Sequence, residues 1–343
     1  MDKVRTVLVV DEVHPLLFQR LSAVEGIEVE YVPESSPEQV VERLNASVRP
    51  VFGLVLRSKL SLNADVLSRS PGLRFIARAG SGIDGIDVEF AKARNITCIH
   101  ASEGNRLAVA EHVLGMILAW KNRLVKGDLS VREGRWDREG HRGLELAGTV
   151  VGLLGYGNNG SQTARLLVAM GCQVLVYDRY KSGFATVWHA NHPAWTKALA
   201  PLSWQHDAVG ALWECSLQDL QAHAQILSLH LPLMPETKGW INRDFLGACP
   251  NLHLLVNAAR GPLVHLPDLL AALDQGALQG ACLDTLPVED PHVWDVPTMN
   301  RLFAKPLVLL TPHVGGWTHE SYLRISEVLA DKIMLYLQEH DRP

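Results

Sequence analysis

Short runs of β-branched and aliphatic residues alternate with amphipathic segments along almost the whole chain. The runs that predict strands are Val7–Val10, Val51–Leu56, Arg74–Ala77, Ile96–Ile99, Val150–Leu154, Gln173–Tyr177, Ile226–His230, His253–Asn257, Ala281–Asp284 and Leu307–Leu310. Most are apolar throughout, which indicates parallel strands buried on both faces. Together with the intervening helical patterns, they predict an α/β fold built from doubly wound parallel sheets.

A chain of 343 residues is longer than a typical domain built around one hydrophobic core, so its length predicts two domains. The helical pattern Asn105–Leu124 opens with a cap-like Asn105 and is expected to lie between the domains. The last pattern, His319–Gln338, is a long amphipathic helix. The pattern alone does not assign that helix to either domain.

The segment Lys181–Trp213 has no clear period and is long for a connection between a helix and a strand. It contains four tryptophans and three histidines, namely Trp188, Trp195, Trp204, Trp213, His189, His192 and His206. We expect a surface excursion with a small aromatic cluster, or an interface. A metal site is the less favoured interpretation, because no acidic or cysteine partners stand at ligand spacing. We therefore expect no metal.

Composition narrows the class of protein. The chain is 47% hydrophobic and 20% charged, with a formal net charge of −5 and no run of basic residues, so we expect neither nucleic-acid nor membrane-surface binding. No apolar run is long enough to span a bilayer, and the short one before Asp11 reads as a first strand, not a signal peptide. The five cysteines form no CxxC pair, which predicts buried free thiols and a cytoplasmic protein.

A glycine-rich turn follows the predicted strand Val150–Leu154 and precedes a helical pattern from Ser161 to Met170. Its glycines, Gly155, Gly157 and Gly160, match GxGxxG. They would permit a tight turn, the approach of a pyrophosphate, and close packing of helix on strand. Alone, this motif is a weak signal.

The next predicted strand, Gln173–Tyr177, is followed at once by Asp178. A carboxylate there can accept the adenosine-ribose hydroxyls and would repel a 2′-phosphate. Strand, glycines, helix, strand and acid in this order predict an NAD site. Asp178 favours NAD over NADP, and Arg179 beside it keeps that preference moderate.

Polar residues follow the later predicted strands, where open α/β sheets bind ligands. Reduction of a 2-keto acid needs a cation for the carboxylate, a proton donor for the carbonyl oxygen, and a carboxylate that keeps the donor protonated. Arg260, Glu289 and His313 supply these types. Singly, each is more often structural than catalytic.

From about Phe52 to Tyr322 the sequence resembles the D-isomer-specific 2-hydroxyacid dehydrogenases, most closely the D-3-phosphoglycerate dehydrogenases. The stretches that carry the resemblance are Arg57–Lys59, Arg78–Asp84, Ala110–His112, Glu145–Gly148, His230–Thr237, Val256–Gly261, Leu283–Asp284 and Thr311–Gly316. The resemblance implies that His313 exchanges the proton with the substrate oxygen, that Glu289 holds and charges it, and that Arg260 binds the carboxylate.

The resemblance also implies a discontinuous, flavodoxin-like substrate domain, 1–101 plus 317–343, a Rossmann NAD-binding domain, 102–316, and a homodimer. The implied cofactor-binding residues are Gly155, Gly157, Asn158, Asn159, Gly160, Asp178, Leu231, Ala258, Ala259, Asp284, Gly315 and Gly316. The implied substrate-binding residues are Arg57, Arg78, Ala79, Gly80, Ser81, Gly82 and Arg138.

Three features depart from the family pattern. Asn158 and Asn159 stand where Arg-Ile is usual, which removes a cation near the pyrophosphate. Asp290 replaces a proline after Glu289, and the tryptophan-rich segment is longer than the common connection.

The expected substrate is a D-2-hydroxy acid or its 2-keto acid. Arg57, Arg78 and Arg138 favour a phosphorylated or otherwise acidic one, with 3-phosphoglycerate as the first candidate. Alternatives are a reductase of glyoxylate or hydroxypyruvate and a D-lactate dehydrogenase. A non-enzymatic NAD-sensing binder is less favoured, because it has no need of a proton donor. The chain ends soon after its last helix, so we expect no regulatory domain.

Overall fold

The computed structural model describes residues 4–189 and 209–340, and the chain divides into two compact units. Unit 1 comprises Met1–Arg106 and Trp317–Pro343, and unit 2 comprises Leu107–Gly316. The chain therefore leaves unit 1 once, forms unit 2 and returns. The functional roles that the resemblance implies for these parts remain predictions.

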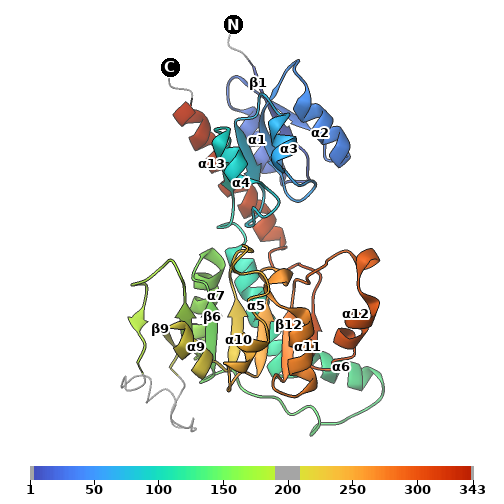
Figure 1. Ribbon diagram of the computed structural model, residues 1–343, viewed down its shortest axis with the longest axis vertical. Coiled ribbons are helices and arrows are strands. Elements are labelled where there is room, and N and C mark those ends of the chain that lie inside the picture. The colour runs from blue at the N-terminus through green and yellow to red at the C-terminus, as the bar shows by residue number, and fades with distance from the viewer. Residues whose placement is uncertain (1–3, 190–208, 341–343) are drawn as a thin grey trace. The chain divides into compact units, whose positions relative to one another are not determined.

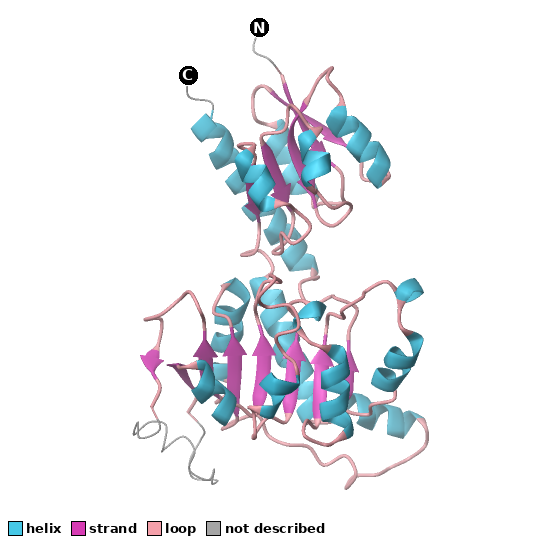
Figure 2. Ribbon diagram, in the orientation of Figure 1, coloured by secondary structure: helices cyan, strands magenta, loops and turns pink. Residues whose placement is uncertain are grey.

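Unit 1 is a five-stranded sheet with helices on both faces (Figures 1 and 2). Its elements are β1 (Arg5–Val9), α1 (Pro15–Ser22), β2 (Ile27–Tyr31), α2 (Pro37–Asn45), β3 (Val51–Leu56), α3 (Ala64–Ser68), β4 (Phe75–Arg78), α4 (Val88–Ala93), β5 (Thr97–His100) and α13 (His319–His340). The order is β2-β1-β3-β4-β5 and every pair is parallel. This is the flavodoxin-like order.

Strand β1 shows why this sheet is doubly wound. Val7 and Val9 belong to one buried cluster, and Leu8 and Val10 belong to another. Successive side chains of a strand point to opposite faces, so both faces of β1 are covered. Helices α1 and α13 cover the first face, where α13 contributes one apolar stripe, for example Leu329.

Unit 2 contains the larger sheet. Its elements are α5 (Arg106–Lys121), α6 (Leu124–Arg132), β6 (Val150–Leu154), α7 (Asn158–Ala169), β7 (Gln173–Tyr177), β8 (Thr186–Val187), β9 (Ala211–Glu214), α9 (Leu217–His223), β10 (Ile226–Leu229), α10 (Arg243–Gly247), β11 (Leu254–Asn257), η1 (Gly261–Leu263), α11 (Leu266–Asp274), β12 (Gly280–Leu283), η2 (Pro291–Val293), α12 (Val296–Phe303) and β13 (Val308–Leu310). The order is β13-β12-β11-β10-β6-β7-β9-β8.

This sheet is parallel throughout, and the arrowheads in Figure 2 point the same way. When β6, β7, β9, β10, β11 and β12 are numbered in turn, they give the Rossmann order 3-2-1-4-5-6. Leu255 of β11 points into one buried cluster and its neighbours Leu254 and Val256 into another. The predicted α/β fold with two doubly wound sheets is confirmed.

Three local features differ from the expectations. Strand β2, with the sequence IEVEY, was missed because it alternates polar and apolar residues, as an edge strand does. The helix expected over Asn105–Leu124 is α5, which ends three residues earlier, at Lys121; Arg123 in the left-handed region (φ 54°) then separates it from α6. The side chain of Asn105 does not cap the helix as expected, because its buried Oδ1 accepts no hydrogen bond from any residue that the structure describes.

The tryptophan-rich segment contributes to the larger sheet. Strand β9, placed in an irregular segment by the sequence pattern, pairs with β7, and β8 extends the edge. Trp188 and Trp213 form a small buried cluster with Val150 and Leu175. The remaining tryptophans and histidines of this segment, Trp195, Trp204, His192 and His206, lie outside the described residues.

Within residues 4–189 and 209–340, every helix is too short or too polar to cross a membrane. No group of three or more His, Cys, Asp or Glu side chains there is arranged to hold a metal ion.

Candidate functional site

The glycine-rich turn joins β6 to α7 next to the switch point of the larger sheet, where β6 lies beside β10. Gly155 has φ 98°, and a Cβ there would lie 2.5 Å from the carbonyl oxygen of His230. A Cβ on Gly160 would lie 2.2 Å from the carbonyl oxygen of Gly155. Only glycine fits either position.

Gly157 has a different surrounding. It precedes α7, and a Cβ placed on it would meet no atom within 4 Å. Open space beside a helix N-terminus is what an approaching phosphate needs, because the first N–H groups of the helix have no partner within it. The turn therefore fits the pyrophosphate of a dinucleotide.

Asp178 follows β7 and lies against the same turn. Its Oδ2 accepts the backbone N–H of Tyr156 at 2.7 Å, and its Oδ1 accepts those of Tyr180 and Lys181 at 2.9 and 3.0 Å. The carboxylate is thus fixed beside the glycines and keeps acceptor capacity on Oδ2. A ribose hydroxyl is a suitable donor for it.

The two asparagines that replace Arg-Ile occupy the first turn of α7. The backbone oxygen of Asn158 accepts from Ser161 Oγ at 3.2 Å, and that of Asn159 accepts from Thr163 Oγ1 at 2.9 Å. These side-chain bonds are local to the helix. The turn consequently relies on backbone N–H groups, with neutral side chains at these two positions.

His313 lies beside Glu289, as the sequence suggested. Its Nδ1 lies 2.9 Å from Oε1 and 3.0 Å from Oε2 of Glu289. Both side chains are about half exposed, at 45% and 51%. A carboxylate on Nδ1 orients the ring and leaves Nε2 as the atom that can reach a ligand.

The backbone at His313 is strained. Its φ of 56° is unusual for a residue that is not glycine, and such a conformation costs about 1–3 kcal/mol. The N–H of His313 donates to the carbonyl oxygen of Asp284 at 2.7 Å. Strain of this kind persists only where surrounding bonds hold the loop, and Asp284 provides them.

The Asp284 side chain is buried (2% exposed) beneath the loop that carries His313. Oδ1 accepts from Thr311 Oγ1 at 2.6 Å and from the N–H of Val314 at 2.9 Å, and Oδ2 accepts from the N–H of Gly315 at 2.8 Å. His112 Nε2, on α5, lies 3.3 Å from Oδ1. Burial acts to raise the pKa of Asp284, but these hydrogen bonds lower it to about 2. Asp284 is therefore an ionised anchor of the loop.

Arg260 follows β11, and its loop is shaped by Asn257. Asn257 Nδ2 donates to the Arg260 carbonyl oxygen at 2.9 Å, and Asn257 Oδ1 accepts from Ala259 N–H at 3.1 Å. The guanidinium donates to the carbonyl oxygen of Ala259 at 2.7 Å. A Cβ on Gly261 would lie 2.0 Å from the backbone of Leu286, so this loop touches the one that leads to Glu289.

The three candidate catalytic residues therefore follow neighbouring parallel strands. Arg260 follows β11, Glu289 follows β12 and His313 follows β13. Carboxyl ends of adjacent parallel strands meet at one edge of the sheet. Leu231 after β10, Ala258 and Ala259 after β11, and Gly315 and Gly316 after β13 lie along the same edge.

The expected substrate residues of unit 1 follow strands of the smaller sheet. Arg57 follows β3, and Arg78 ends β4 with its Nε donating to the Arg57 carbonyl oxygen at 3.1 Å. The loop 79–82 begins there. Ala79 N–H donates to Leu56 O at 2.8 Å, and Gly80 O accepts from Ala101 N–H at 3.0 Å, so the ends of β3, β4 and β5 hold this loop.

Arg138 lies apart from the other site residues of unit 2. It belongs to the exposed segment between α6 and β6, which returns to the sheet where Gly148 N–H donates to Gly171 O and Leu144 N–H to Lys121 O. In Figure 1 this segment runs along the end of unit 2 opposite to the arrowheads of Figure 2. The structure does not bring Arg138 to His313 in its own unit.

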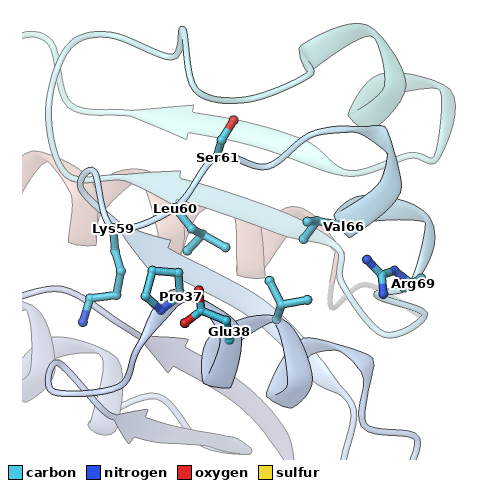
Figure 3. A pocket seen from close by; sticks show the side chains of 8 residues that line it. Pro37, Glu38, Lys59, Leu60, Ser61, Val66 and Arg69 are labelled. Atoms are coloured by element: carbon cyan, nitrogen blue, oxygen red, sulfur yellow. The ribbon is translucent and has the colours of Figure 1, made fainter. Parts of the chain in front are cut away.

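Figure 3 shows a pocket of unit 1 that is separate from the predicted site residues. It lies near α2 and α3 and is lined by Pro37, Glu38, Val41, Lys59, Leu60, Ser61, Val66 and Arg69. None of the predicted site residues lines it.

Sequence reasoning missed two residues of the His313 loop. His112 and Thr311 both contact Asp284, and His112 Nε2 lies 3.0 Å from Thr311 Oγ1. Both occur in stretches that carry the resemblance, Ala110–His112 and Thr311–Gly316. That signal could have identified them.

The sequence of unit 2 matches a family model. Residues 114–315 match the D-isomer specific 2-hydroxyacid dehydrogenase, NAD binding domain. This chain belongs to the D-isomer-specific 2-hydroxyacid dehydrogenases. Its unit 2 contains the nicotinamide-cofactor-binding domain of that family, in agreement with the glycine turn and Asp178.

Relatives of known name agree with this family. The chain is 33% identical over 331 residues to a D-3-phosphoglycerate dehydrogenase of Mycobacterium bovis, which covers 96% of this chain and 56% of the relative. The chain thus spans about half the length of that relative. A hydroxypyruvate reductase of Thermotoga maritima is 30% identical over 280 residues, which covers 82% of this chain and 83% of the relative.

Solved structures also share the fold. The TT0316 protein of Thermus thermophilus superposes with a TM-score of 0.75 at 30% identity, covering 97% of each chain. A glyoxylate reductase of Paecilomyes thermophila has a TM-score of 0.80 at 20% identity, covering 99% of this chain and 97% of the other. At that identity, the second comparison shows the fold alone.

Proposed function

We propose that this protein transfers hydride reversibly between NAD(H) and C2 of a D-2-hydroxy acid. The observation that carries the proposal is the pair His313–Glu289, with Nδ1 2.9 Å from the carboxylate, at the strand edge that also presents the glycine turn and Arg260. A nucleotide-binding protein without catalysis needs no oriented proton donor there.

Within this proposal, His313 holds the exchangeable proton on Nε2 and Glu289 orients the ring through Nδ1. In reduction, the imidazolium gives its proton to the carbonyl oxygen of the substrate, and in oxidation the neutral ring takes it back. Arg260 binds the C1 carboxylate through its guanidinium, with Ala79–Gly82 as a second contact. The nicotinamide, when bound, supplies or accepts the hydride.

NAD is proposed over NADP because Asp178 places a fixed negative charge beside the glycine turn. We propose that the cofactor contacts the glycine turn and the two asparagines at the start of α7. It is also proposed to contact residues that follow the later strands, namely Leu231, Ala258, Ala259, Gly315 and Gly316. Asp284 is proposed to belong to the cofactor site, where it anchors the loop that carries Gly315.

The substrate proposed first is 3-phosphoglycerate or another acidic 2-hydroxy acid, because of Arg57 and Arg78 in unit 1. Glyoxylate, hydroxypyruvate and D-lactate are the alternatives, and relatives named for the first two are among the matches. Oxidation of NADH measured against a panel of 2-keto acids tests the proposal. Turnover that persists in Arg260→Ala and His313→Gln, or turnover of no 2-keto acid, would refute it.

We propose a homodimer formed through the exposed apolar side chains of α6 and the segment after it. These side chains and their exposed fractions are Leu124 57%, Val125 49%, Leu129 53%, Val131 53%, Trp136 80% and Leu144 54%. Apolar groups gathered in one segment are typical of a protein–protein contact.

We also propose a cytoplasmic location, supported by five free cysteines.

A further inference from the structure

The sheet of unit 1 has its own topological switch point, between β1 and β3. Open α/β sheets bind ligands in the crevice outside the carboxyl ends of the strands at this point. Asp11 follows β1 and Arg57 follows β3, so these two residues flank it.

The Arg57 loop is fixed by one carboxylate oxygen. Asp11 Oδ2 accepts the backbone N–H groups of Arg57 at 2.6 Å, and of Ser58 and Lys59 at 3.2 Å each. An anion that accepts three N–H groups holds a loop firmly, because each bond is charge-assisted. The Cα of Arg57 consequently has a defined position.

The Arg57 side chain is held by an aromatic ring. Its Cζ lies 3.8 Å from the ring centroid of Trp317. Trp317 in turn packs edge-on against Tyr322 at 5.4 Å, and Tyr322 packs against His14 at 5.6 Å. Thr318 and Ser321 exchange backbone and side-chain hydrogen bonds at 3.0 Å, which fixes the start of α13 beside Trp317.

Stacking leaves the donors of Arg57 available. A guanidinium that lies over a ring uses its face, while its five N–H groups point outward in its plane. Among the residues that the structure describes, no oxygen accepts a hydrogen bond from this guanidinium. Burial lowers the pKa of Arg57, although the charge of Asp11 opposes this, so the cation is partly desolvated.

We propose that Trp317 is a positioning residue that sets substrate specificity. By stacking on Arg57, it presents a planar set of donors to a second acidic group on the substrate, a phosphate monoester or a carboxylate remote from C1. This inference rests on the proposed function and names its substrate class. It differs from a purely steric role, in which Trp317 would affect every 2-keto acid alike.

The test compares substrates that differ by one acidic group. Hydroxypyruvate and 3-phosphohydroxypyruvate differ by a phosphate, and pyruvate and oxaloacetate differ by a carboxylate. For each pair, the selectivity is the ratio of kcat/KM for the substrate with the second acidic group to that for the substrate without it. The arm with the larger ratio in the wild type identifies the acidic group.

In Trp317→Leu we expect that ratio to fall about tenfold, mainly through a higher KM for the acidic substrate. Trp317→Phe keeps a ring and should retain most of the selectivity. Arg57→Lys keeps the charge but loses the flat, stacked face, so it should lower the ratio similarly. Arg69→Ala removes an exposed arginine that is paired with Asp65, and it is the matched control expected to leave the ratio unchanged.

A double-mutant cycle isolates the pair. If Trp317 acts through Arg57, then Trp317→Leu combined with Arg57→Lys should lower the ratio little more than either change alone. Additive losses, equal losses on substrates with and without the second acidic group, or a wild type without preference in either arm would overturn the inference.

A binding measurement separates this inference from the proposed function. Calorimetric titration with 3-phosphoglycerate and with malate needs no turnover. Weaker binding of either acid by Trp317→Leu than by Trp317→Phe supports the inference even if no 2-keto acid is reduced. Equal binding by the two variants would overturn it while leaving any measured reductase activity intact.

Discussion

His112 Nε2 lies 3.3 Å from Asp284 Oδ1, and the same carboxylate accepts the N–H groups of Val314 and Gly315 at 2.9 and 2.8 Å. The charge of Asp284 therefore ties α5 to the loop that carries His313. Because this carboxylate is buried and ionised, it carries more of the loop's stability than a surface acid would.

Asp284→Asn should lower both activity and stability. Its amide group would present N–H donors where N–H donors already point, so at least one buried bond is lost, at about 2–3 kcal/mol. The free energy of unfolding in urea and kcat with the best 2-keto acid check this. Asp274→Asn is the matched control, since Asp274 pairs with Arg301 and Lys305 on an exposed surface, where solvent screens the charges, and the change should cost much less stability. Equal effects of both changes would contradict the anchoring role.

The secondary structure around the glycine turn was predicted well. Strand β6, the glycine turn, α7, β7 and Asp178 follow one another along the chain, and Asp178 accepts the N–H of Tyr156 in that turn. The strand bounds Val150–Leu154 and Gln173–Tyr177 agree with the structure. Buried apolar runs and obligatory glycines are local signals, so sequence reading finds them.

Contacts between distant segments were predicted less well. The sequence gives no local sign that His112 reaches Asp284, or that Trp317 stacks on Arg57, because tertiary packing sets these distances. Arg138, assigned to the substrate site through the resemblance alone, lies in the exposed segment between α6 and β6, and its role stays a prediction.

Asp178 should determine the choice of cofactor. We expect the wild type to prefer NADH to NADPH, and Asp178→Ser to lose about tenfold or more in kcat/KM for NADH, because a charge-assisted bond to the ribose is lost. Efficiency with NADPH should rise relative to NADH. Steady-state kinetics with both cofactors check this, with Asp65→Asn on α3 as a control for loss of a surface carboxylate. A wild type that uses NADPH equally well would refute the ribose contact.

His230 should make stability depend on pH. Burial lowers its pKa from 6.5 to about 4, so the folded state binds this proton less readily than the unfolded state. Its contribution is fully present above pH 6.5 and is lost as the pH falls towards 4, by up to about 3 kcal/mol. Unfolding in urea from pH 7 to pH 4 should show a steeper loss for the wild type than for His230→Leu. Parallel curves would contradict this assignment.

The apolar side chains of α6 should hold two copies together. Leu129→Glu places a charge in that patch and should convert a dimer to monomers, since an unpaired charge is costly in an apolar contact. Sedimentation velocity of the wild type and the variant measures this. Val48→Glu is the control, because Val48 is 84% exposed in unit 1 and lies outside the patch. A wild type that sediments as a monomer would rule out the proposed homodimer.

The pair His313–Glu289 gives the most direct test of the mechanism. Glu289→Gln keeps the size of the side chain and a hydrogen bond to Nδ1, but it removes the negative charge 2.9 Å from the ring. Removing that charge favours the neutral imidazole. In reduction, which needs the imidazolium, the alkaline limb of the rate should move to lower pH. In oxidation, which needs the neutral ring, the acidic limb should move the same way. His313→Gln should lose about 10²–10⁴-fold in kcat in both directions. The measurement is the pH–rate profile of each enzyme in both directions, with Asp290→Asn, the next residue along, as the matched loss of charge. Profiles of the wild type and Glu289→Gln that superimpose would show that Glu289 does not control the proton on His313.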